Sequence, residues 1–147
     1  MDYLPGDVFL TRNTPELNLT PGYWQHAAIT TGKVIIEGQA EPGKVIMVTL
    51  KGFLGRNPER IHLRPKDAEL GKKAAEFAED YIGSAYHRRS FNCVTLIRVV
   101  YGKALGFEPY WFMPDSLYRS LLFNRIDYYE NYKGWVQPED WYEGRLV

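Results

Sequence analysis

The stretch WQHAAITTGKVIIEG, residues 24–38, contains the strongest local folding signal in the chain. Two apolar runs rich in alanine and β-branched residues flank Thr31-Gly32, which predicts two antiparallel strands joined by a tight turn. If Thr31 and Gly32 form a two-residue turn, Thr30 faces Lys33, and the same register places His26 opposite Glu37. A symmetric four-residue loop keeps this pairing, whereas a three-residue loop breaks it.

An opposed His26 and Glu37 have a chemical consequence. Directly opposed side chains on one face of a sheet have Cβ atoms about 4.5–5.5 Å apart. A carboxylate at that distance can accept the imidazole N–H, hold one tautomer and favour the imidazolium form. The alternative is a surface ion pair that contributes at most about 1 kcal/mol.

Turn residues and apolar spacing predict the remaining elements. Further strands are predicted over residues 7–12, 44–50 and 60–65. Helices are predicted over residues 67–83, 93–106 and 114–123, and a late strand over 125–132. Strands grouped before helices predict an α+β fold.

The only cysteine, Cys93, lies where a polar loop turns into the second predicted helix. Asn92 or Ser90 is the expected N-cap of that helix. Free backbone N–H groups and the positive end of a helix favour a thiolate and can bind the oxyanion of an acyl-transfer intermediate. A catalytic Cys–His pair and a buried structural thiol both fit these residues.

A nucleophilic thiol needs a base that later acts as an acid, and histidine is the usual choice. His87 lies in a polar loop and is expected in solvent, and His62 is expected to point away from the core. His26, on the hairpin, is therefore the candidate. The sequence has no closely spaced pair of Cys or His residues of the kind that binds zinc. Neither a metal nor an organic cofactor is expected.

Composition argues against several classes of protein. A chain of 147 residues predicts a single domain over residues 1–147. Lys and Arg number 18, as do Asp and Glu, which argues against general electrostatic binding of nucleic acid or anionic membrane. No apolar stretch approaches the roughly 20 residues of a membrane span. The first residues do not read as a signal peptide, so a cytoplasmic location is expected.

Aromatic residues are the candidates for contact with a substrate. The last 40 residues hold 11 of the 22 aromatic residues in the chain, and they either fill core or line a groove. The candidates for substrate binding are Tyr23, Trp24, Tyr86 and Trp111, with Tyr110 and Trp141 as further groove residues. For each of them, packing in the core is the alternative.

Three segments together resemble a known family: LPGDVFLTR at 4–12, WQHAAITTGKVIIEG at 24–38 and FNCVTLIRVVY at 91–101. They look like the circularly permuted branch of the NlpC-type papain-fold cysteine hydrolases, the YiiX/YebB-like group, which is related to the lecithin retinol acyltransferase family. The resemblance covers roughly residues 3–105. It implies a papain-like fold in which a twisted, mostly antiparallel sheet or partial barrel packs against a helix carrying the cysteine.

The resemblance also implies an activity. Cys93 is the implied nucleophile, His26 the base and then the acid, and Glu37 the orienter. The implied reaction is hydrolysis of an amide or peptide bond through a thioacyl intermediate, with a peptide or acyl-amide substrate such as cell-wall peptide.

Two other functions fit the same residues. The aromatic C-terminal third motivates a thioesterase or acyltransferase that acts on lipid or acyl substrates. Val94 and Thr95 replace the acidic residue that many relatives carry after the cysteine, and this difference motivates a non-catalytic binding domain.

Overall fold

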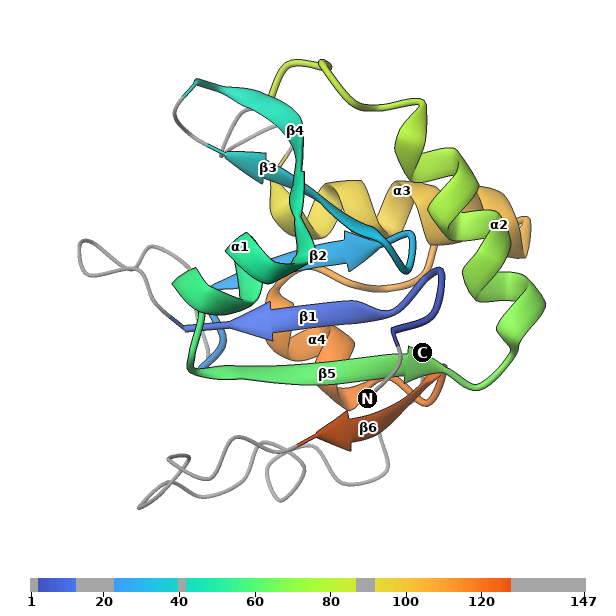
Figure 1. The fold of residues 1–147 in the computed structure, drawn as a ribbon. Coiled ribbons are helices and arrows are strands. Elements are labelled where there is room, and N and C mark those ends of the chain that lie inside the picture. The colour runs from blue at the N-terminus through green and yellow to red at the C-terminus, as the bar shows by residue number, and fades with distance from the viewer. Residues whose placement is uncertain (1–2, 13–22, 40–41, 87–91, 128–147) are drawn as a thin grey trace.

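A computed structural model describes residues 3–12, 23–39, 42–86 and 92–127 of the chain. Within these residues, six strands form one antiparallel sheet with the spatial order β4-β3-β2-β1-β5-β6 (Figure 1). The strands are β1 Val8–Thr11, β2 His26–Thr30, β3 Val34–Gln39, β4 Lys44–Thr49, β5 Arg60–Pro65 and β6 Phe123–Asp127. The helices are α1 Leu50–Arg56, α2 Ala68–Glu79, α3 Cys93–Leu105 and α4 Pro114–Arg119. The coarse α+β class predicted from the sequence is confirmed.

Capping side chains set where the two longer helices begin. Asp67 accepts hydrogen bonds from the backbone of Glu69 and Leu70 at the start of α2. Asn92 does the same for Val94 and Thr95 at the start of α3, and Gly106 ends that helix in the left-handed region. Among the described residues, no helix has both the length and the apolar character needed to cross a membrane.

Two predicted boundaries in the C-terminal part are wrong or incomplete. The helix expected over residues 114–123 stops at Arg119, because Ser120 takes an extended backbone and Phe123 already begins β6. The late strand therefore starts two residues earlier than expected, and residues 128–132 of that prediction lie outside the described residues. Helix α1, which follows β4 directly, was not predicted.

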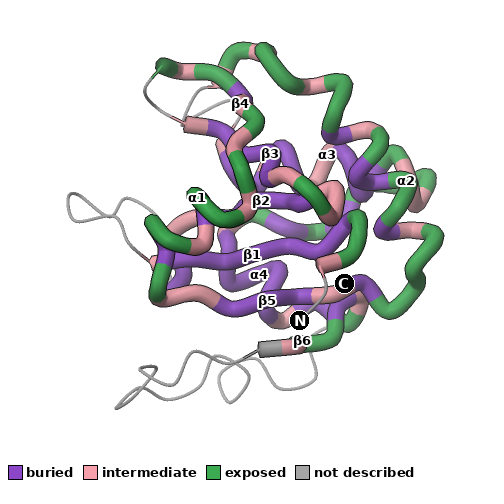
Figure 2. Tube along the Cα trace, in the orientation of Figure 1, coloured by how far each residue is buried: buried purple, intermediate pink, exposed green. Residues whose placement is uncertain are grey.

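The central strands are buried on both faces. Alternate residues of the sheet, including Val8, Leu10 and Ile29, join α2, α3 and α4 in the main core cluster. The residues between them, including Phe9, join Phe53 of α1 in a second cluster on the other face. Figure 2 shows β1 buried along its length and β4 largely uncovered.

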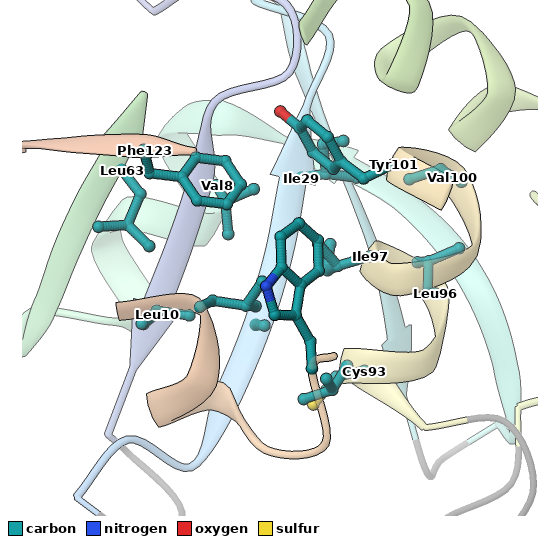
Figure 3. Packing of buried hydrophobic residues seen from close by; sticks show 14 of the residues in the cluster. Val8, Leu10, Ile29, Leu63, Cys93, Leu96, Ile97, Val100, Tyr101 and Phe123 are labelled. Carbon is teal, nitrogen blue, oxygen red and sulfur yellow. The ribbon is translucent and has the colours of Figure 1, made fainter. Parts of the chain in front are cut away.

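The apolar side of the cysteine-bearing helix, whose spacing predicts a helix over residues 93–106, faces the sheet. Cys93, Leu96, Ile97 and Val100 lie along one side of α3 (Figure 3). The last three are fully buried, so the apolar spacing read from the sequence marks the core face of this helix correctly.

The hairpin forms, but its register differs from the predicted one. The turn is centred on Gly32 and Lys33, since the Thr31 N–H donates to the Val34 carbonyl at 3.0 Å. Gly32 has a φ of 96° and Lys33 does not enter the positive region, as expected for a turn that takes glycine at its first central position. Thr30 therefore pairs with Ile35 and not with Lys33.

Although the predicted register is wrong, His26 and Glu37 still lie on the same face of the sheet. Strand β3 is displaced by two residues along β2 relative to the predicted register. Side chains alternate with period two, so a two-residue displacement preserves the face on which each residue lies. His26 and Glu37 become diagonal neighbours and not direct opposites, a separation that long side chains can bridge.

A turn at Pro5-Gly6-Asp7 leads into β1 and anchors the sheet to α2. The Asp7 N–H donates to the Leu4 carbonyl, and Gly6 has a φ of 91°, as a turn with proline before glycine requires. A Cβ at Gly6 would lie 2.3 Å from the backbone of Gly71 in α2. Glycine is therefore needed here both for its conformation and for the close approach of the two segments.

Asp7 is completely buried and makes more contacts than a turn residue needs. It accepts the Leu4 N–H, as an aspartate in a turn commonly does, but it also contacts His62 Nε2 at 2.6 Å and Arg64 Nη2 at 2.9 Å. His62 points away from the main cluster yet is buried against Phe9. This histidine therefore points away from the main core, as expected, but its side chain is buried on the opposite face.

Replacing Asp7 with asparagine is expected to lower the free energy of unfolding by about 3 kcal/mol at neutral pH, because His62 and Arg64 lose a buried carboxylate. Burial raises the pKa of Asp7, but the hydrogen bonds to His62 and Arg64 lower it by more than burial raises it. The pKa of Asp7 is therefore below its ordinary value of 3.8. A depressed pKa stabilises the fold above the unfolded-state value, and this stability is lost as pH falls through the folded-state value. The difference between wild type and Asp7→Asn in urea unfolding should therefore shrink below about pH 4.

Asp80, exposed at the end of α2, provides the control. Asp80→Asn should leave the urea midpoint almost unchanged. An equal loss in both variants, or a difference for Asp7→Asn that persists undiminished at about pH 2, would contradict the buried ion-pair explanation.

Candidate active site

The structure brings Cys93, His26 and Glu37 together from three separate elements. His26 is the first residue of β2, Glu37 lies in β3, and Cys93 is the first residue of α3. The His26 Nε2 atom lies 2.8 Å from Glu37 Oε1. The Cys93 side chain is also a hydrogen-bond partner of the imidazole. Since Nε2 faces the carboxylate, Nδ1 is the ring nitrogen left for the thiol.

Glu37 is the most enclosed member of the group. Only 2% of its side chain is exposed. Its Oε2 atom accepts from Arg56 Nη2 at 2.6 Å and from Gln39 Nε2 at 3.4 Å, while Oε1 faces His26. Burial raises the pKa of Glu37, but the hydrogen bonds and charges of His26 and Arg56 outweigh it and hold the pKa below its ordinary value. The side chain is therefore a carboxylate at neutral pH.

His26 is held in the protonated state by its two neighbours. Burial alone would lower its pKa, but hydrogen bonds to Cys93 and Glu37, with their charges, raise the pKa of His26 to about 10. About a fifth of the His26 side chain, 21%, is exposed. An imidazolium placed between a carboxylate and a thiol is the arrangement that stabilises a thiolate.

The backbone at the start of α3 determines which donors remain for a substrate. Asn92 Oδ1 accepts from the N–H groups of Val94 and Thr95, each at 3.0 Å. Of the two N-caps expected from the sequence, Asn92 therefore has this role. Because the cap occupies those two donors and the Leu96 N–H donates to the Asn92 carbonyl, the N–H of Cys93 is the donor of this first turn that is left for a developing oxyanion.

The aromatic residues proposed for substrate binding are mostly in the core. Tyr23, Trp24 and Trp111 all belong to the main cluster, and none is more than 4% exposed. Their burial favours the packing alternative. Tyr86 lies against β3, where a Cβ on Gly38 would approach its ring to 1.9 Å, so its ring also has a packing contact. Trp141 lies outside the described residues.

Two residues near the site were not predicted from the sequence. Asp115, fully buried at the start of α4, accepts the backbone N–H groups of Tyr23 and Trp24 at 2.9 and 2.8 Å. It thereby fixes the segment that leads directly into His26. Arg56, at the end of the unpredicted helix α1, is the second residue. An acidic residue after a proline predicts only a helix start, so no local signal marks the contact of Asp115.

Neither of the other two histidines is placed at the site by the part of the chain that the structure describes. His62 is bound to Asp7 on the opposite cluster, and His87 lies outside the described residues. Within residues 3–12, 23–39, 42–86 and 92–127, no group of three or more His, Cys, Asp or Glu side chains is arranged to hold a metal ion.

Comparison with known proteins gives no match to a family model, to a curated protein or to a solved structure. What this chain does must therefore be inferred from the chemistry of the site.

Proposed function

We propose that this protein is a cysteine hydrolase that cleaves an amide or peptide bond through a thioacyl intermediate. The single observation that carries the proposal is the convergence of Cys93, His26 and Glu37, which lie far apart in the sequence, with the imidazole between the thiol and a buried carboxylate. A structural thiol has no need of such a partner. The papain-like arrangement implied by the resemblance, with the histidine strand preceding the cysteine helix, belongs to the same proposal.

In the proposed acylation step, a Cys93 thiolate paired with the His26 imidazolium is the reacting state. The Cys93 thiolate attacks the carbonyl carbon, and the carbonyl electron pair moves onto oxygen, where the Cys93 N–H can donate to it. His26 then gives its Nδ1 proton to the leaving nitrogen as the C–N bond breaks. The products of this step are a free amine, a thioester on Cys93 and a neutral imidazole.

The deacylation step restores the starting state. A water molecule attacks the thioester carbon while His26 Nδ1 accepts one of its protons. The C–S bond breaks, the carboxylic acid leaves, and the thiolate and imidazolium are regenerated. Glu37 keeps the ring in one orientation throughout, because its bond to Nε2 does not involve the nitrogen that transfers the proton.

Alkylation of Cys93 by iodoacetamide tests the pair without knowledge of the substrate. Wild-type protein should be labelled readily below pH 7. In His26→Ala, labelling at about pH 6 should be slower by about tenfold or more, because a thiol without an imidazolium partner is mostly protonated there. Cys93→Ala gives the background.

His87→Ala is the matched control, since it removes the histidine nearest to Cys93 in the sequence. Its labelling rate should equal that of the wild type. If labelling slowed in His87→Ala but not in His26→Ala, His26 would not be the histidine that activates Cys93. Labelling that requires unfolding of the wild-type protein would mean an inert thiol and would end the proposal.

An enzyme acting on acyl chains is the second candidate, favoured by one observation. Phe107, Tyr110 and Phe112, which follow α3 directly, are 59%, 76% and 58% exposed. The rings of Tyr110 and Phe112 lie edge to face with centroids 4.6 Å apart. Large aromatic side chains gathered on a surface often mark a site of contact with an apolar ligand.

Substitution of these three residues by serine separates the two substrate classes. With an acyl-chain substrate, turnover of a long-chain acyl thioester should fall by about tenfold, because apolar contact is lost. Turnover of a short peptide amide should not change. Equal turnover of the thioester by wild type and by the triple variant would remove the basis for the second candidate, and the variant's Cys93 labelling rate would serve as the folding control.

A further inference from the structure

Helix α1 connects the second core cluster to the candidate active site. Thr49 caps the helix by accepting the Gly52 N–H at 3.1 Å. Phe53 is the one residue of α1 that is buried, and it packs against Phe9 with ring centroids 5.6 Å apart. Arg56 lies one turn further along, with its guanidinium 5.7 Å from the Phe53 ring centroid. Burial of Phe53 therefore fixes the position from which Arg56 reaches Glu37.

The two partners of the Arg56–Glu37 ion pair differ in solvent exposure. The Arg56 side chain is 49% exposed, whereas the carboxylate that it contacts at 2.6 Å is 2% exposed. An ion pair between two exposed groups contributes little. A buried carboxylate that loses its cation, in contrast, is left without compensation for the water that it gave up.

The proposed catalytic cycle changes the charge around Glu37. In the free protein, both His26 and Arg56 are cations beside it. After His26 has protonated the leaving group, the imidazole is neutral and Arg56 remains as the cation in contact with the carboxylate. Gln39 adds a neutral hydrogen bond at 3.4 Å.

We propose that Arg56 is a positioning residue of this site, which keeps Glu37 ionised and directed at His26 Nε2 while the imidazole gives up and regains its proton. The inference rests on the proposed function, because it assigns Arg56 a role in the same Cys93–His26–Glu37 group. Arg56 acts through Glu37 and is not placed in contact with the reacting atoms.

The sign of the expected effect follows from the charges. Arg56 helps to hold the pKa of Glu37 below its ordinary value, so its removal moves that pKa upward. Glu37 is then protonated at a higher pH and supports the imidazolium less well in mild acid. Loss of Arg56 should therefore weaken the activation of Cys93 mainly on the acid side of the pH profile.

The experiment measures iodoacetamide labelling of Cys93 against pH in the full chain. Arg56→Gln should lower the labelling rate at about pH 5 by about three- to fivefold and change it little at about pH 8. Arg56→Lys, which keeps the charge, should recover most of the rate. Lys51→Gln removes a positive charge from an exposed position of the same helix and should match the wild type at every pH.

A double substitution shows whether Arg56 acts through Glu37. In a Glu37→Gln background, adding Arg56→Gln should not slow Cys93 labelling further, because the carboxylate through which Arg56 acts is already absent. Thermal unfolding of each variant reports any general loss of structure. A purely structural role would lower the unfolding temperature without moving the acid side of the profile, and that result would overturn the proposal.

Failure of this inference can be told apart from failure of the proposed function. If His26→Ala slows labelling but Arg56→Gln leaves the profile unchanged, Arg56 is not a positioning residue and the Cys–His pair stands. If His26→Ala has no effect, the proposed function fails, and the inference about Arg56 fails with it.

Discussion

Burial of the Glu37 carboxylate is the constraint on which the candidate site depends. A carboxylate taken out of water must be neutralised by hydrogen bonds and opposite charge or become protonated. In this protein His26, Arg56 and Gln39 supply those contacts from β2, α1 and β3. The contact with Glu37 holds the imidazole through Nε2, which leaves Nδ1 as the ring nitrogen available to Cys93.

The pairing of His26 with Glu37 could be predicted from the sequence because strand periodicity tolerates some errors. The expected register was wrong, since it placed glycine second in the turn where the structure has it first. The resulting two-residue displacement kept both side chains on one face. The helix starts at Asp67 and Asn92 were predictable for a similar reason, because a cap is a local interaction between residues two or three positions apart.

Long-range contacts had no local signal and were missed. Asp115 binds the backbone of residues 23 and 24 across a sequence separation of more than 90 residues. Helix α1 has two glycines in seven residues, so intrinsic propensity argues against it, and burial of Phe53 overrides that propensity. The Arg56 contact depends on this helix and was missed with it. The aromatic residues could be counted but not assigned, because core packing and a ligand surface use the same side chains.

Within the described residues, a carboxylate contacts both a histidine and an arginine at Glu37 and at Asp7, and of these two networks the one at Glu37 adjoins the thiol. Asp7 accepts from Arg64 and contacts His62 Nε2 at 2.6 Å, much as Glu37 does with Arg56 and His26. Within the described residues, His62 Nδ1 is buried and has no hydrogen-bond partner, whereas the His26 ring interacts with Cys93 and is partly exposed. Contact with a histidine and an arginine therefore neutralises a buried carboxylate in this fold and does not by itself indicate catalysis. The same arrangement can support catalysis only where the second ring nitrogen of the histidine is next to a nucleophile. The reactivity of Cys93 therefore tests whether this site is catalytic, whereas the stability of the fold does not.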